Sequence, residues 1–250
     1  MLLTFLQVSK LRMVTVWLAA DLNTPAGRAV ARAAVAHTKS SAQLRLGLLH
    51  NSDNEPGLVA RLAQAALLHL APTPAITLLS KLLKEDTAAK LMDGRKQLQD
   101  FDIPGLEMTE FLQQVAALDT SQFPIHRTFL KTALGWGPGK IGLMVNGRVL
   151  GPLKEGELLT NNDFDLLERL TMSQYGEKLV QAFHNQLDVQ AAGVSDQAML
   201  VAALLTARPP GKPRTEITYK SDQHSVVTVE PRMEGRPAFD IVAVVDPVSR

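Results

Sequence analysis

The first fifty residues carry two strand patterns on either side of one helical pattern. Residues 13–20 are apolar and rich in β-branched side chains, which is typical of a buried strand, and residues 44–49 predict a second strand. Between them, Thr24 can cap a helix that Pro25 begins and that we expect to reach about Thr38. Two strands joined by one helix predict a right-handed βαβ unit. One face of the helix is expected to consist of Ala26, Ala29, Val30, Ala33 and His37.

Residues 57–135 have helical periodicity throughout. In the first part of this segment, Leu58, Leu62, Ala66 and Leu70 recur every four residues. Further helices are predicted from Thr73-Pro74 to Asp93-Gly94, from Met108 to Leu118, and from Thr120 or Ser121 to about Gly135. The segment is therefore predicted to be an all-helical insertion, with a separate helical bundle as the alternative.

Strand patterns return after the helical segment. Residues 141–145 and 148–150 are two apolar runs separated by Asn146-Gly147. Asn-Gly predicts a hairpin, because both central positions of the turn need a positive φ. Asn161 or Asn162 is then expected to cap a helix that carries Phe164, Leu167 and Leu170, and a further helix is expected to reach about Leu187.

This order of elements predicts an α/β fold, a thioredoxin-like sheet with a large all-helical insertion, over residues 13–190. Residues 194–207 are predicted to form an apolar C-terminal helix that Ser195 can cap. Proline-rich residues 209–213 predict a linker, so residues 208–250 are interpreted as a linker and the truncated start of the next β segment.

Composition removes several classes of function. The 250 residues include no cysteine, which excludes disulfides, thiolate metal sites and thiol mechanisms. The 26 basic and 25 acidic residues are scattered, so no nucleic-acid partner is expected, and no apolar run is long enough to predict a membrane span. In thioredoxins the redox pair lies between the first strand and the next helix, and here that stretch, 21–24, has no sulfur. Pro138 is the residue near the hairpin where a cis bond is plausible, although trans is the ordinary state.

Three stretches resemble the UDP-glucose:glycoprotein glucosyltransferase family, the folding sensors of the endoplasmic reticulum. They are residues 14–27 (VTVWLAADLNTPAG), residues 145–153 (VNGRVLGPL) with Asn162-Asp163-Phe164 after them, and residues 244–250 (VVDPVSR). The second stretch is the most specific. The order of the stretches suggests the third of the family's thioredoxin-like domains, with the start of the next segment attached.

The resemblance implies a location in the lumen of the endoplasmic reticulum and, as partners, misfolded glycoproteins and neighbouring domains of the same chain. It implies that the parent protein transfers glucose from UDP-glucose to high-mannose glycans through a C-terminal, metal-dependent domain with Asp-x-Asp motifs. No cofactor is expected in this part. Asp163-Phe164-Asp165 has the motif's letters but opens a predicted helix, where acidic residues favour the helix dipole.

Other candidates for chemistry are weak. No pair of the six histidines has the spacing of a helical zinc site, so we interpret them as surface or satisfied core residues. The glycine-rich stretch 135–140 leads into a strand, whereas a phosphate-binding loop leads into a helix N-terminus.

The predicted helices carry more apolar residues than one buried face needs. These residues are the candidates for function, because a folding sensor needs accessible apolar surface. The candidate client-binding residues are Leu67, Leu68, Leu78 and Leu82 in the inserted helices, and Met199, Leu200, Leu204 and Leu205 in the C-terminal helix. The simpler alternative is that these residues pack inside the domain or against its neighbours. A sharper hypothesis is that the 199–205 helix covers an apolar groove and is displaced by a misfolded client.

Two further functions stay open at this stage. One is a non-catalytic chaperone domain related to those of protein disulfide isomerases. The other is an enzyme acting on a small molecule through the histidines, for which a deep polar pocket with perturbed histidines would be the evidence.

Overall fold

The computed structural model describes residues 12–176 and 196–199. Its sheet has four strands, β1 (Val14–Ala20), β2 (Leu44–His50), β3 (Gly142–Val145) and β4 (Arg148–Leu150), in the order β2-β1-β3-β4. β1 runs parallel to β2 and antiparallel to β3, and β3 pairs antiparallel with β4. The first strand and the late hairpin therefore share one sheet, which confirms the predicted thioredoxin-like topology.

Helix α1 (Pro25–Ser40) begins as predicted, with the Thr24 hydroxyl accepting a hydrogen bond from the Gly27 amide at 3.1 Å. The predicted helix face is wrong in part, since Ala26 and Ala29 are exposed and Ala33 is half-buried. Alanine is compatible with either side of a helix, and so it carries little information about facing. The buried face consists of Gly27, Arg28, Val30, Ala31, Ala34, Val35, His37 and Thr38.

Helices occupy the predicted insertion, with one extra break. The helices are α2 (Leu58–His69), α3 (Pro72–Leu82), α4 (Glu85–Met92), α5 (Met108–Ala116) and α6 (Gln122–Leu134), with a 3₁₀ turn at Leu98–Asp100. The single helix predicted from Thr73 to Asp93 is divided because Lys84 adopts an extended conformation. Glu85 and Asp86 then lie in the first turn of α4, where acidic side chains favour the dipole of a new helix.

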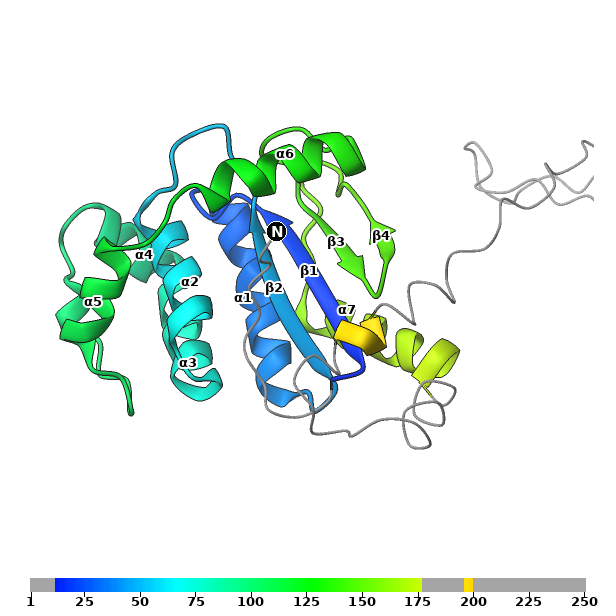
Figure 1. Cartoon of the computed structure of the whole chain (residues 1–250), viewed down its shortest axis with the longest axis horizontal. Helices are drawn as coiled ribbons and strands as arrows, with labels where there is room; N and C mark the ends of the chain where they lie inside the picture. Colours follow the sequence, from blue (N-terminus) through cyan, green and yellow to red (C-terminus); the bar gives the residue numbers. More distant parts are fainter. Residues whose placement is uncertain (1–11, 177–195, 200–250) are drawn as a thin grey trace, which may run out of the picture. The chain divides into compact units, whose positions relative to one another are not determined.

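Helices cover both faces of the sheet (Figure 1). The first face packs against α1, which in turn contacts α7 (Asn161–Thr171). Helix α6 packs on the second face, where Leu130 joins Trp17, Ala19, Leu49 and Trp136 in a separate apolar cluster. Thus α6 belongs to the sheet's second layer, while α2 to α5 extend beside it (Figure 1).

The hairpin turn has the geometry that its sequence requires. Asn146 and Gly147 have φ values of 46° and 84°. The Asn146 side chain also accepts a hydrogen bond from the Thr15 amide at 2.8 Å and donates one to the Met13 carbonyl at 2.9 Å. The turn is therefore tied to the start of β1 as well as closing the hairpin.

The cap of α7 differs from the prediction by one or two residues. Thr160 is the N-cap, rather than Asn161 or Asn162, because its hydroxyl and the Asp163 carboxylate form a reciprocal capping box. A short π-helical turn, Met172–Gly176, follows the helix. The predicted helix to Leu187, most of residues 194–207 and all of residues 208–250 lie outside the described residues. Within the described part, no helix is long and apolar enough to cross a membrane.

Candidate functional site

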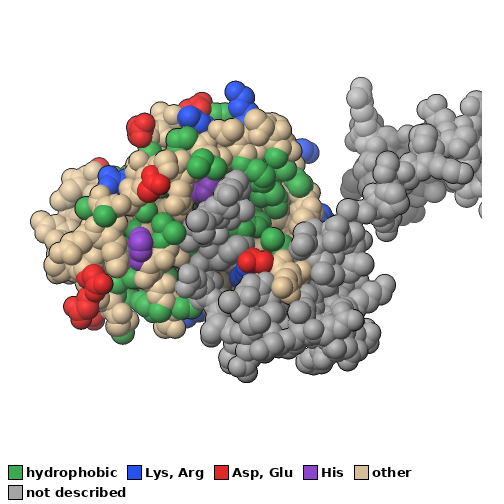
Figure 2. Space-filling model, viewed as in Figure 1, with side chains coloured by type: hydrophobic (Ala, Val, Ile, Leu, Met, Phe, Trp, Pro, Cys, Tyr) green, Lys and Arg blue, Asp and Glu red, His purple; other side chains and the backbone are tan. Residues whose placement is uncertain are grey.

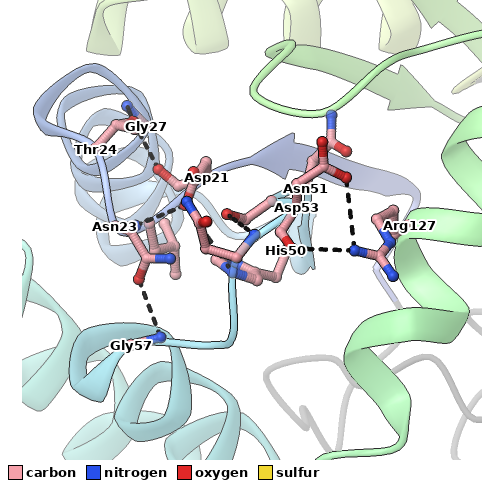
Figure 3. Close-up of polar contacts among 12 residues, drawn as sticks. Asp21, Asn23, Thr24, Gly27, His50, Asn51, Asp53, Gly57 and Arg127 are labelled. Carbon is pink, nitrogen blue, oxygen red and sulfur yellow. Dashed lines mark hydrogen bonds and ion pairs between the residues drawn. The ribbon is translucent and has the colours of Figure 1, made fainter.

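The position that holds a redox pair in thioredoxins is closed here by hydrogen bonds (Figure 3). Asp21 follows β1, and its carbonyl accepts from both the amide (3.1 Å) and the hydroxyl (2.8 Å) of Thr24. Its carboxylate accepts from the Asn23 amide at 2.9 Å. These bonds join polar groups of the loop to one another, and the loop has no sulfur.

Gly27 lets the loop lie directly on the first turn of α1. A β-carbon at this position would come within 2.0 Å of the Asp21 carbonyl oxygen, a distance that no side chain can adopt. The close approach leaves no space above the helix N-terminus at this point.

Two interactions tie the loop to the inserted helices. Arg28, which is 2% exposed, bonds both oxygens of Glu85 at 2.8–3.1 Å and also donates to the Leu22 and Asn23 carbonyls. The Asn23 side chain accepts from the Gly57 amide at 3.1 Å, immediately before α2 (Figure 3). The loop between β1 and α1 is therefore a junction between the sheet and the insertion.

Two buried histidines lie beside this junction. His50 Nε2 is 3.9 Å from the Asp21 carboxylate, and both of its ring nitrogens lack a hydrogen-bond partner. Burial lowers the pKa of His50, and Asp21 opposes this effect. Burial, assisted by the charge of His50, lowers the pKa of His126 to about 4. Burial therefore favours the neutral form of both side chains.

The space beside these histidines is small. The cavity beside His50 holds only about 10 Å³ and is lined mainly by apolar residues, with Phe123 and Gln64 among them. A larger polar cleft of about 440 Å³ lies between the end of α1 and α7, but its histidine, His37, is bonded to Glu168 at 2.6 Å. The cavity beside His50 has no room for a substrate, and the histidine of the larger cleft is engaged by Glu168.

The residues with Asp-x-Asp letters do not fit a metal. The Asp163 carboxylate accepts from the amide and hydroxyl of Thr160, both at 2.7 Å, and these bonds lower its pKa. Asp165 pairs with Arg169 at 2.9 Å. Across residues 12–176 and 196–199, no group of three or more histidine or acidic side chains could hold a metal ion.

The described prolines include one cis bond, Gly151–Pro152, and Pro138 is not cis.

The second face of the sheet carries an apolar row that the sequence reading missed. Trp17 on β1 is opposite Met144 on β3, which is opposite Val149 on β4, so the three side chains share a face. Gly47 on β2 makes room for the Trp17 ring, because a β-carbon there would lie 2.4 Å from it. Val149 is 44% exposed and Met144 half-buried. Figure 2 shows hydrophobic side chains gathered around α6 and the hairpin on this face.

A polar row on the same face holds the start of the predicted C-terminal helix. Arg45 on β2 is opposite Thr15 on β1, and its guanidinium bonds the Thr15 hydroxyl at 2.7 Å. The Asp196 carboxylate lies 2.7 Å from the same guanidinium. Burial lowers the pKa of Arg45, which Asp196 opposes. Residues 196–199 are helical and Ala198 is fully buried.

The predicted client-binding residues fall into three groups. Leu67, Leu78 and Leu82 are at most 1% exposed, so the structure places these three in the core. Leu68 is half-buried and packs against the same core, and Met199 is also half-buried. Leu200, Leu204 and Leu205 lie outside the described residues. The inserted helices pack against neighbours on more than one side, which explains why Leu67, Leu78 and Leu82 are apolar.

The chain is similar to a thioredoxin-like family model and to much longer glucosyltransferases. A family model described as a thioredoxin-like domain matches residues 3–206. UDP-glucose:glycoprotein glucosyltransferase 1 from Homo sapiens is 33% identical over 246 residues, 97% of this chain and 16% of that protein. The Drosophila melanogaster enzyme of the same name is 29% identical over 97% of this chain and 15% of its own length. The chain therefore spans under a fifth of the length of these relatives.

Among solved structures, the chain is similar to the Trx3 domain of UGGT in its detergent-unbound form, with 18% identity and a TM-score of 0.38. That match covers 66% of this chain and 94% of the solved one. A thioredoxin-like oxidoreductase from Silicibacter pomeroyi is similar over 64% of this chain, with 14% identity and a TM-score of 0.41.

Proposed function

The chain belongs to the thioredoxin-like domain family, and on that premise we propose that it is a redox-inactive, non-catalytic domain that binds misfolded glycoproteins through apolar surface. The observation that carries the proposal is the apolar row on the second face of the sheet, in which Val149 is 44% exposed and Met144 half-buried beside the buried Trp17. Partly exposed apolar side chains on a sheet face can receive an unfolded segment. The redox position, by contrast, has no sulfur and is closed by its own hydrogen bonds.

The relatives support the choice of partner. They are named as glucosyltransferases that act on glycoproteins with UDP-glucose. We infer that this chain is a domain of such a protein, the third of its thioredoxin-like domains, and that it works in the lumen of the endoplasmic reticulum beside other domains of the same chain. UDP-glucose and a divalent metal would be bound by another domain, since Asp163 and Asp165 are engaged in a helix cap and an ion pair.

The covering helix is part of the proposal. Asp196 is paired with the buried Arg45, which gives the predicted 199–205 helix an anchor on the second face. We propose that this helix limits access to the apolar row and that a misfolded client displaces it. The two partners differ in exposure: Asp196 is 61% exposed and regains water when it is released, while the buried Arg45 keeps its bond to the Thr15 hydroxyl.

Two substitutions on exposed positions test the binding surface. Val149→Ser removes apolar area from the proposed row, and we expect roughly fivefold weaker binding of a denatured glycoprotein. Leu166→Ser is the matched control, since Leu166 is 64% exposed but lies on α7. Binding is measured by fluorescence anisotropy with labelled, denatured glycoprotein. Equal losses in the two variants would contradict the assignment of the surface.

A second pair of substitutions tests the anchor. Asp196→Asn should weaken the hold on Arg45 and increase the binding of a hydrophobic dye and of the denatured glycoprotein. Asp165→Asn is the control, because it removes another surface ion pair, the one with Arg169. If both variants bind the dye to the same extent as the parent chain, the anchor has no role in access.

A chaperone domain of the protein disulfide isomerase kind is the remaining alternative. Both alternatives use an apolar surface, so client binding alone does not separate them. A glycosyltransferase domain in the same open reading frame would support the first, and its absence would favour the second.

A further inference from the structure

A seam between the start of α6, α2 and the end of β2 is built around two buried histidines. His50 ends β2, His126 lies on α6, and the Phe123 ring lies between them. The ring centroids are 5.4 Å apart for His50 and Phe123 and 6.3 Å apart for Phe123 and His126, both in edge-on geometry. His50 is 5% exposed and His126 is 2% exposed. This seam is where the first half of α6 is held against the ends of the strands.

The seam is suited to neutral rings only. Neither nitrogen of His50 has a hydrogen-bond partner, and His126 Nδ1 has none either. A protonated imidazole needs an acceptor or water at both nitrogens, and a buried charge without such partners is costly.

The charged groups around the seam cannot neutralise the positive charges of two protonated histidines. β1 contributes the Asp21 carboxylate, 3.9 Å from His50. α2 contributes Gln64, which is uncharged and bonded to Gln122 at 3.0 Å. The loop after β2 contributes Asp53, which pairs with Arg127 of α6 at the surface, at 3.6 Å (Figure 3). One carboxylate therefore faces two histidines that would also repel each other.

We propose that this histidine pair is an acid-operated release for α6, in which protonation drives the helix off the sheet and uncovers the apolar side chains beneath it. Those side chains include Leu130 of α6 and its neighbours Trp17, Leu49 and Trp136. Protonation of either ring starts the release, because the added proton has no hydrogen-bond acceptor beside it while α6 is in place.

The pH window follows from the histidines. In the open state each histidine regains its ordinary pKa of about 6.5, whereas in the closed state the pKa of His126 is about 4. The open state thus binds more protons between these values, and opening becomes more favourable as the pH falls through that window. From pH 6.5 to pH 4.5, His126 alone favours opening by a factor of roughly forty.

Hydrogen exchange of the whole chain between pH 7.5 and pH 4.5 tests the release. After correction for intrinsic exchange rates, the amides of α6 should exchange roughly forty times faster at pH 4.5 than at pH 6.5, while β1 and α7 stay protected. His126→Leu should remove most of this acceleration. His69→Gln is the control, since His69 is exposed, and it should leave the acceleration intact.

Other outcomes decide against the release. If α6, β1 and α7 lose protection together, acid unfolds the domain and releases no single helix. If His126→Leu does not fold at pH 7.5, His50→Gln takes its place and should also reduce the acceleration. Equal acceleration in the parent chain and in the folded variant would overturn the proposal.

Discussion

Single residues with unusual surroundings define the closed redox position. Gly27 is in a helix, where alanine is normally favoured by about 1 kcal/mol. Its neighbour across the loop is the Asp21 carbonyl, and there is no space for a side chain between them. The local preference of the helix and the packing of the loop therefore oppose each other at this position.

Gly27→Ala should be destabilising, in spite of the helix preference. We expect a loss of about 2 kcal/mol in the free energy of unfolding, since the loop must move away from α1. Urea denaturation followed by circular dichroism measures the effect. In the same helix Ala29→Gly at an exposed position should cost about 1 kcal/mol, and a stabilising Gly27→Ala would show that the loop is not in close contact.

At the level of elements, the Arg28–Glu85 pair joins α1 to α4. The two partners are unequal, because Arg28 is 2% exposed whereas the Glu85 side chain is 54% exposed. Removing the buried partner loses bonds to two carbonyls and the packing of the side chain, while removing the exposed partner loses a screened ion pair.

Arg28→Ala is expected to cost about 3 kcal/mol in unfolding free energy, and Glu85→Ala about 1 kcal/mol. Urea denaturation at low and high salt measures both. The Glu85 effect should shrink at 1 M salt, and the Arg28 effect should largely persist. Equal costs for the two substitutions would mean that the buried guanidinium is not held by the loop carbonyls.

Elements set by local chemistry were predictable from the sequence. The strands, the Thr24 cap and the Asn146-Gly147 turn all follow from residues next to one another in the chain. The buried face of α1 and the break between α3 and α4 at Lys84 were not predictable from the sequence, because alanine and leucine fit both buried and exposed positions of a helix. The apolar row was also missed, since it depends on the register between strands far apart in the sequence, although the continuous apolar run 143–145 is a signal that both faces of β3 carry apolar side chains.

At the level of the whole molecule, the structure separates two kinds of apolar residue. Leu67, Leu78 and Leu82 belong to a core that joins the sheet to the insertion. Met144 and Val149 lie at the less covered side of the second face. A folding sensor needs the second kind, because core residues cannot serve as binding surface in a stable domain.

The central claim is that this chain acts through apolar surface regulated by its own C-terminal helix. The most direct measurement is the binding of denatured glycoprotein and a hydrophobic dye to the parent chain and to a variant lacking residues 195–206, with circular dichroism to confirm that the variant is folded. The account predicts increased binding of both ligands by the variant. Unchanged binding in a folded variant would contradict it.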